Sequence, residues 1–335
     1  MNKIIDNFEK NFSEITEIIK STRQKVFKLV NTELINLYWQ VGEYISKKVE
    51  SSEWGKSIVD NLADYIEKTQ PELKGFSNKN LWRMKQFYET YKDNTKLSEL
   101  LRELSWTNNL IILSRAKTIE AKEFYIHLTI KEKYSKRELE RQIDSSYFER
   151  HMLSDTKVSP LVREISSDIS STFKDNYVLE FLNLPKDFSE KELQKSIINN
   201  LKNFILEFGK DFAFIGEEYR VQVGNSDFFI DLLFFHRDLQ CLVAFELKVT
   251  EFKPEYLGKI NFYLEALDRD VKKVHENPSV GVILCTSKDN EVVEYALSRN
   301  ISPALVAEYQ TKLPDKKLLE QKLHEFLMLK EGDSN

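Results

Sequence analysis

The sequence Phe228-Phe-Ile-Asp-Leu-Leu-Phe-Phe235, followed after a short turn by Cys241-Leu-Val-Ala-Phe-Glu-Leu-Lys248, organises this chain. Both segments are apolar runs of strand length, and their close spacing predicts an antiparallel hairpin. Because the runs are apolar throughout, both faces of each strand are expected to be covered. Charge enters only at Asp231, Glu246 and Lys248. Burying a carboxylate without a compensating partner is costly, so both acids are candidates for a function.

The alternation of side chains along a strand predicts where these charges lie. Glu246 and Lys248 share one face of their strand, and pairing with the neighbouring strand can bring Asp231 to the same end of the hairpin. Two adjacent carboxylates repel each other, and a hard divalent cation would relieve that repulsion. The alternative is a buried ion pair between Lys248 and one carboxylate, with the other carboxylate facing solvent at a strand end.

The residues on either side of the hairpin predict alternating helices and strands. Ser189 and Glu192 form a capping box that opens a helix ending near Phe208. Other expected elements are strands at 219–223, 280–285 and 304–307, helices at 254–267 and 290–297, and a helix after Leu313. With the hairpin included, the expected order in this half of the chain is α-β-β-β-α-β-α-β.

The first half of the chain is expected to be helical. A long amphipathic helix is expected at 2–49, and further helices at 56–70, 78–91 and 119–131, with others opening near Ser105 and at Ser135. The face of the first helix expected to be buried consists of Phe27, Val30, Leu34, Leu37, Tyr38 and Val41.

The second and third helices, with Pro71, Gly75 and Ser77 between them, are similar to a helix-turn-helix. In such motifs the first turns of the second helix reach bases and phosphates. The candidates for DNA contact are therefore Lys79, Asn80, Arg83 and Lys85. The alternative is an ordinary solvated helix face.

Composition sets the domain count and the compartment. The chain has 335 residues, 41% hydrophobic and 31% charged, with a net charge of −5. That length is enough for two domains. The helical pattern ends near His151, and the Ser- and Asp-rich stretch that follows, with Pro160 and Pro185, predicts a linker at 153–187 that holds a small helix at 177–182. The expected domains are therefore a helical domain at 1–152 and a second domain at 188–330. No apolar run approaches the roughly 18 residues that span a bilayer, and no signal peptide is apparent. We therefore expect a cytoplasmic protein whose two cysteines are buried free thiols.

Three segments resemble the YhcG family of bacterial proteins: 229–236, 242–248, and the stretch Phe252-Lys-Pro-Glu-Tyr-Leu-Gly-Lys-Ile-Asn-Phe-Tyr-Leu264. The resemblance implies an α+β protein overall. Its N-terminal domain would be all-helical and winged-helix-like. Its second domain would be an α/β PD-(D/E)XK domain, like that of restriction endonucleases, with a mixed central sheet. In place of the Pro of that signature, Ile230 precedes Asp231.

The resemblance also implies a chemistry. Asp231, Glu246 and the backbone carbonyl of Leu247 would hold Mg²⁺ or Mn²⁺, which binds oxygen ligands and takes few carboxylates. Lys248 would orient the attacking water and stabilise phosphate charge. It would not act as a general base, because two neighbouring anions oppose the lowered pKa that a base needs. Glu207, Lys259 and Tyr263 are implied as accessory residues; Lys259 stands where some relatives have Gln.

The expected function is hydrolysis of DNA phosphodiester bonds by a metal-dependent nuclease, with a role in defence against, or processing of, mobile DNA. A homodimer is also in keeping with such nucleases. Two alternatives remain open. One is a catalytically inactive DNA- or junction-binding protein, and the other is an interaction subunit of a restriction-type complex.

Overall fold

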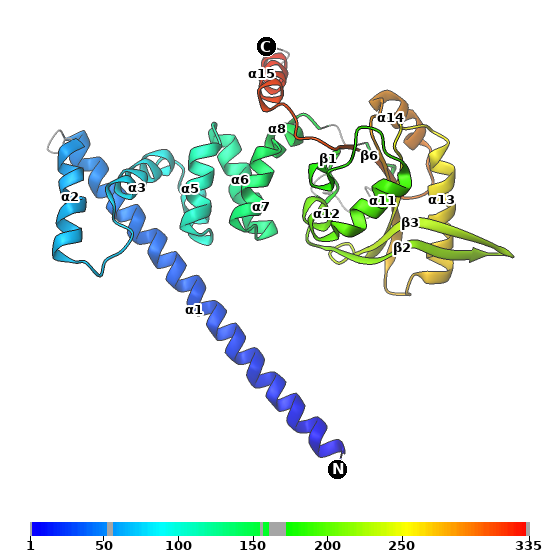
Figure 1. Ribbon diagram of the computed structural model, residues 1–335, viewed down its shortest axis with the longest axis horizontal. Helices are drawn as coiled ribbons and strands as arrows, with labels where there is room; N and C mark the ends of the chain where they lie inside the picture. The colour runs from blue at the N-terminus through cyan, green and yellow to red at the C-terminus, as the bar shows by residue number, and fades with distance from the viewer. Residues whose placement is uncertain (1, 52–55, 155–156, 161–171, 333–335) are drawn as a thin grey trace. The chain divides into compact units, whose positions relative to one another are not determined.

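The computed structural model describes residues 2–51, 56–154, 157–160 and 172–332. It divides the chain into two compact units, Met1–Ile143 (unit 1) and Asp144–Asn335 (unit 2). The linker expected at 153–187 includes residues 155–156 and 161–171, which lie outside the described residues, and the expected domain boundaries stay predictions. Figure 1 shows the elements of both units along the chain.

Unit 1 is helical, as expected. Its elements are α1 (Asn2–Glu50), α2 (Lys56–Thr69), α3 (Asn78–Tyr91), α4 (Thr95–Leu100), the 3₁₀ helix η1 (Leu101–Glu103), α5 (Trp106–Arg115), α6 (Ile119–Glu132) and α7 (Lys136–Asp144). The described residues of unit 1 contain no β-hairpin that could form the wing of a winged helix.

The packed face of α1 differs from the expected one. Phe27 and Val30 are 68% and 60% exposed, whereas Ile35 and Ile45 are 1% exposed. The reason is a close approach of α1 to α3: a Cβ added to Gly42 would lie 2.1 Å from the carbonyl oxygen of Met84. This approach turns the Gly42 face of α1 toward the bundle and leaves most of the expected face outside it.

Unit 2 is built on a six-stranded mixed sheet in the order β1-β6-β5-β4-β3-β2. The strands are β1 (Asn176–Val178), β2 (Phe212–Val223), β3 (Ser226–His236), β4 (Cys241–Leu247), β5 (Asn277–Cys285) and β6 (Ala304–Gln310). The helices are α8 (Tyr147–Met152), α11 (Glu190–Asn199), α12 (Leu201–Phe208), α13 (Tyr256–Ala266), α14 (Asn290–Ser298) and α15 (Lys316–Gly332), with the short 3₁₀ helix η2 (Glu180–Leu182) and the short π-helix η3 (Leu267–Val271).

The expected hairpin is confirmed as β3 and β4, which pair antiparallel, while β5 and β6 extend the sheet in parallel. All seven residues of β4 are buried, because a hydrophobic cluster covers each face of the sheet. One cluster includes α11 and α12 and the other α13 and α14 (Figure 1). The helix α13 lies close to β5, where a Cβ on Gly281 would meet Ile260 at 2.5 Å.

Three elements of unit 2 differ from expectation. The small helix expected at 177–182 is instead the strand β1 followed by η2; a strand of three residues is too short to show alternation and exists through its pairing with β6. The helix expected to end near Phe208 breaks at Asn200 into α11 and α12. The strand β2 begins at Phe212, well before 219. An irregularity at Gly216 interrupts the alternation of its side chains, so the pattern predicts only the later part of the strand.

Both cysteines, Cys241 and Cys285, are buried free thiols, as expected. Within the part of the chain that the structure describes, no helix is long and apolar enough to cross a membrane.

Candidate active site

The candidate site lies where the β3–β4 ladder ends. The last paired residues are Leu232 and Phe245. Beyond them, the Asp231 side chain replaces the backbone of β3 as the partner of β4: its Oδ2 accepts a hydrogen bond of 2.7 Å from the backbone N–H of Leu247. The two strands therefore separate at the point where both acidic residues stand.

Side chains from two helices hold β3 in this separated position. The Tyr263 hydroxyl of α13 donates a 2.6 Å hydrogen bond to the carbonyl of Phe229, and Gln194 of α11 donates one of 2.8 Å to the carbonyl of Asp231. Alternate carbonyls on a strand point to the same edge, so both bonds satisfy groups that a continued ladder would have used. The position of Asp231 is thus fixed from both faces of the sheet.

Glu246 is the most deeply buried charge of the site, with 0% of its surface exposed. Its Oε1 lies 2.9 Å from the ammonium of Lys248 and 2.6 Å from that of Lys259. Its Oε2 has no hydrogen-bond partner among the described residues. A buried carboxylate oxygen without a partner is costly, so this atom indicates a ligand that the protein's own side chains do not supply.

Lys248 is held between two carboxylates. Its ammonium lies 3.1 Å from Glu190 on α11, as well as beside Glu246, and 5.3 Å from the ring centre of Tyr256. Burial lowers the pKa of Lys248, but the hydrogen bonds and charges of Glu246 and Glu190 outweigh burial and leave the pKa above its ordinary value. The raised pKa keeps the proton on Lys248, which favours orientation and charge stabilisation over a role as general base.

Asp231 carries the most perturbed carboxyl of the site. Burial and the neighbouring charge of Glu246 raise its pKa to about 6, although the N–H of Leu247 opposes the shift. Lys259 shows the reverse balance, since the bond to Glu246 overcomes burial and raises its pKa to about 12. The site thus holds two lysines that stay charged and one carboxyl that resists ionisation.

These residues fit a hard divalent cation. The unpartnered Oε2 of Glu246 and the reluctant carboxyl of Asp231 would both gain from a nearby positive charge. Mg²⁺ commonly takes only one or two carboxylates and keeps several waters. Two carboxylates are therefore a sufficient set, although the described residues contain no group of three or more His, Cys, Asp or Glu side chains that could hold a metal.

The structure does not bring Glu207 to this site. Its Oε1 accepts a 3.1 Å hydrogen bond from the N–H of Val178 in β1 and lies 3.4 Å from the ammonium of Lys174. Three strand spacings separate β1 from β4, or roughly 14 Å. Glu207 does lie on a helix ahead of the strands, as the resemblance implies, but its turn of α12 faces the β1 edge of the sheet, where it anchors β1.

The acidic helical residue that does reach the site is Glu190, and neither Glu190 nor Gln194 is predicted from the sequence. Both belong to α11, which the capping box at Ser189 and Glu192 opens as expected. One signal in the sequence points to them: they are four residues apart and so lie on one face of the helix. The implied accessory residues Lys259 and Tyr263, in contrast, both lie in the site.

The four residues predicted to contact DNA on α3 fall into two groups. Asn80 bonds to the carbonyl of Gly75 and accepts a 3.0 Å hydrogen bond from the indole of Trp106, and Lys85 is paired with Glu89. Asn80 closes the turn before α3, and Lys85 forms an ion pair along the surface of that helix. Both side chains therefore stabilise the fold. Lys79 and Arg83 remain candidates.

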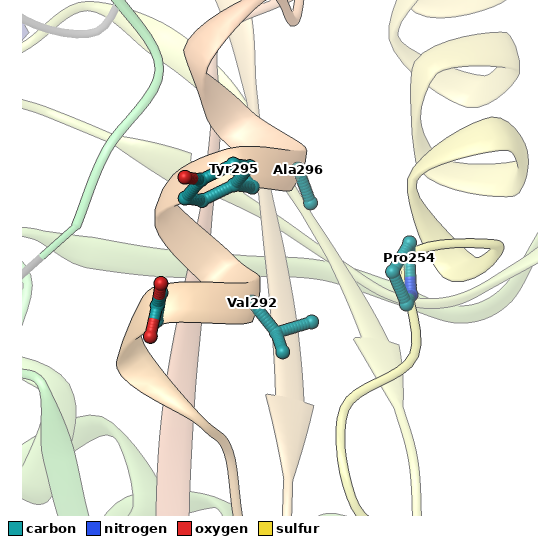
Figure 2. Close-up of a pocket in the computed structure, with 5 residues that line it drawn as sticks. Pro254, Val292, Tyr295 and Ala296 are labelled. Carbon is teal, nitrogen blue, oxygen red and sulfur yellow. The ribbon is translucent and has the colours of Figure 1, made fainter.

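A cavity of about 510 Å³ lies elsewhere on unit 2, between α14 and the segment ahead of α13. Figure 2 shows its lining, which includes Pro254, Val292 and Tyr295. None of the site residues described above lines this cavity.

The fold and the site together define a class of protein. A mixed sheet whose hairpin carries an Asp on one strand and Glu-x-Lys at the end of the next is the arrangement of the PD-(D/E)XK nucleases. Residues 170–324 match the family profile described as the YhcG PDDEXK nuclease domain, and residues 14–150 match the DUF1016 N-terminal domain.

A curated protein of Escherichia coli (strain K12) named "Putative nuclease YhcG" is 30% identical to this chain over 346 residues, which covers 92% of each. This chain belongs to the YhcG family.

Two solved structures show weaker similarity. A repair endonuclease from Pyrococcus abyssi is 14% identical, with a TM-score of 0.25, over 39% of this chain and 50% of that one. EndoMS in complex with double-stranded DNA is 17% identical, with a TM-score of 0.26, over 40% of this chain and 48% of that one. The match thus spans about half of each solved chain, and similarity at this level does not bear on function.

Proposed function

We propose that this protein hydrolyses phosphodiester bonds of DNA with Mg²⁺ or Mn²⁺ as its cofactor. The observation that carries the proposal is Glu246: it is fully buried, one oxygen is shared by Lys248 and Lys259, and the other has no partner among the described residues. A cluster kept only for stability would gain from having every buried oxygen bonded.

The roles follow from the contacts. Asp231, the free oxygen of Glu246 and the carbonyl of Leu247 would hold the cation. When bound, the cation would polarise the phosphate and lower the pKa of an attacking water. Lys248, fixed by Glu190, would donate hydrogen bonds to that water or to a non-bridging phosphate oxygen. Lys259 is 45% exposed and would meet the phosphate from the solvent side.

A basic surface on unit 1 would assist substrate binding. Lys79 and Arg83 form no ion pair with any residue that the structure describes, and they stand on the first turns of α3. Cations in that position can contact phosphates. The expected role in defence against, or processing of, mobile DNA stays a prediction.

A substrate panel tests the proposal. Purified protein with Mg²⁺ or Mn²⁺ would be offered duplex, single-stranded, branched and modified DNA, and RNA, with chelator and the Asp231→Asn variant as controls. We expect at least one DNA to be cut only by the wild type and only with the metal. Cleavage of RNA alone, or cleavage of DNA that persists equally in Asp231→Asn, would contradict the proposal. Tight DNA binding without any cleavage would favour the inactive binding protein.

A further inference from the structure

The helix α1 has two apolar faces, and only one of them is used inside unit 1. Ile35, Gly42 and Ile45 pack into the bundle. A second set of apolar residues on α1 is exposed to solvent by 37–68%; this set, the α1 stripe, consists of Ile15, Ile18, Ile19, Val26, Phe27, Leu29, Val30, Leu34 and Leu37.

The two faces point in different directions. At 100° per residue, Ile19, Val26 and Leu37 lie within roughly 20° of one another and about 140–160° from Gly42. The described polar contacts between α1 and other elements involve residues from Lys28 to Glu50. Figure 1 shows the N-terminal half of α1 extending beyond the other helices of unit 1. The centre of the α1 stripe therefore faces away from the bundle, whereas Phe27 and Leu34 lie at its edge, in the direction of Ile45.

The spacing of the α1 stripe is that of a helix that packs on another helix. Ile15, Ile19, Val26, Val30, Leu34 and Leu37 follow at intervals of three, four or seven residues. Such intervals keep apolar residues on one narrow seam over several turns, and this is the pattern of coiled coils. The run of fours from Val26 to Leu34 is a local departure from strict heptads, of the kind that unwinds a supercoil without ending it.

Exposed Ile, Val and Phe make this helix costly to keep alone. β-branched and aromatic residues have modest helix propensity, and helices without a packing partner are only marginally stable in water. Contiguous apolar surface of this extent marks an interaction site.

We infer that the α1 stripe is a self-association surface, on which α1 of a second copy of this chain packs to form a dimer. Nine side chains, each about half exposed, offer on the order of 700 Å² per helix and about 1,400 Å² for a pair. A stable interface needs roughly 1,200–2,000 Å² in total, so two copies of the α1 stripe suffice for each other. This inference does not depend on the proposed nuclease function.

The test is the molar mass of the full-length protein in solution, measured by light scattering during size-exclusion chromatography. The wild type is expected to be a dimer. Val26→Glu/Val30→Glu places carboxylates in the centre of the α1 stripe and is expected to give a monomer. Both positions are exposed and outside the bundle core, so the variant is expected to remain folded.

The matched control is Ser21→Glu/Lys25→Glu, which adds carboxylates to the same stretch of α1 but outside the α1 stripe, and it is expected to stay a dimer. Circular dichroism during thermal unfolding checks that all three proteins keep the same cooperative transition. The monomeric variant is expected to lose only a small part of its helix signal, because the N-terminal half of α1 then has no packing partner. A monomeric wild type would overturn the inference, because another part of the chain or a different protein would then have to cover the α1 stripe. A dimer that survives Val26→Glu/Val30→Glu would also overturn it, because two copies would then meet elsewhere.

Discussion

At the scale of single residues, the site is a balance between two carboxyls and two lysines. Glu246 is neutralised on one side by Lys248 and Lys259, while Asp231 has one backbone hydrogen bond and a neighbouring negative charge. The metal-free protein therefore holds Asp231 in an unfavourable state at neutral pH. This cost gives the protein a measurable dependence of stability on pH.

Asp231→Asn is expected to stabilise the metal-free protein above about pH 6. The folded pKa of Asp231, about 6, exceeds its ordinary value, so the folded state holds the proton more tightly than the unfolded state does. The contribution of Asp231 to the free energy of unfolding is present at about pH 4 and is lost as the pH rises through 6. Asn carries no charge at any pH, so the variant does not lose this stability. Its free energy of unfolding above pH 6 is expected to exceed that of the wild type by an amount on the order of 2 kcal/mol, after discounting for the solvent that reaches Asp231.

Urea unfolding with chelator present, followed from about pH 4 to pH 8, measures this effect. The curves of wild type and Asp231→Asn are expected to meet at the acidic end and to diverge as the pH rises. A difference that is constant across the range would show that Asp231 titrates normally.

At the scale of elements, α11 positions the site from one face of the sheet and α13 from the other. Glu190 and Gln194 of α11 hold Lys248 and the carbonyl of Asp231, while Lys259 of α13 holds Glu246. In the proposed mechanism the hairpin would supply the reacting groups, and the two helices would set their orientation. Changes in α11 should therefore alter the chemistry without removing the metal.

Glu190→Gln is expected to slow cleavage about tenfold at saturating metal, because Lys248 loses one of the two carboxylates that orient it. Without Glu190 the pKa of Lys248 falls, so the decline in rate at alkaline pH is expected to begin at lower pH than in the wild type. Single-turnover rates across pH measure both effects. Lys191→Gln, an exposed neighbour on the same helix, is the control and should leave the profile unchanged. An unshifted profile in Glu190→Gln would assign Glu190 to stability alone.

For α3, Lys79→Ala/Arg83→Ala is expected to weaken duplex DNA binding and to reduce the salt slope by about two, since two phosphates would no longer be neutralised by the protein. Asn80→Ala is expected to act differently: it should lower the unfolding temperature, since Asn80 bonds to Gly75 and Trp106. Binding titrations at several salt concentrations make the comparison. If the affinity and slope are unchanged, α3 is a packing or protein-binding helix.

The elements also show what sequence could and could not predict. Long apolar runs and a tight turn predict the strands β3 and β4 and the contact between Glu246 and Lys248. The hairpin and this contact both depend on spacing along a short stretch of sequence. Glu190 and Glu207 could not be told apart, because each is an acid on a helix before the strands. Which of them reaches the hairpin depends on the break at Asn200 and on the packing of α11 and α12, and these are tertiary effects. The used face of α1 was missed for a similar reason, since the helix has two apolar faces.

At the scale of the whole molecule, a cation bound at the hairpin end would link the two acids and so stabilise unit 2. Mg²⁺ or Mn²⁺ is expected to raise its unfolding temperature by mass action, with about 2.7 kcal/mol gained at a hundredfold excess over the dissociation constant. Asp231→Asn and Glu246→Gln should both abolish the rise. Asp238→Asn, in the exposed turn at the other end of the hairpin, should keep it. A rise that persists in the first two variants would place the ion elsewhere.

We propose that the hairpin end is catalytic, and a substitution of Lys248 tests this proposal most directly. Single-turnover cleavage would be measured with saturating metal, on whichever DNA the panel identifies, for the wild type, Lys248→Ala and the control Lys273→Ala. Lys273 is exposed near the start of β5, at the opposite end of that strand from the partner of Glu246. We expect Lys248→Ala to lose roughly 10²-fold or more in rate while keeping the metal-induced rise in unfolding temperature, and Lys273→Ala to match the wild type. Cleavage by Lys248→Ala at the wild-type rate would contradict the proposal, because the site built around Glu246 would then not be where the bond is cut.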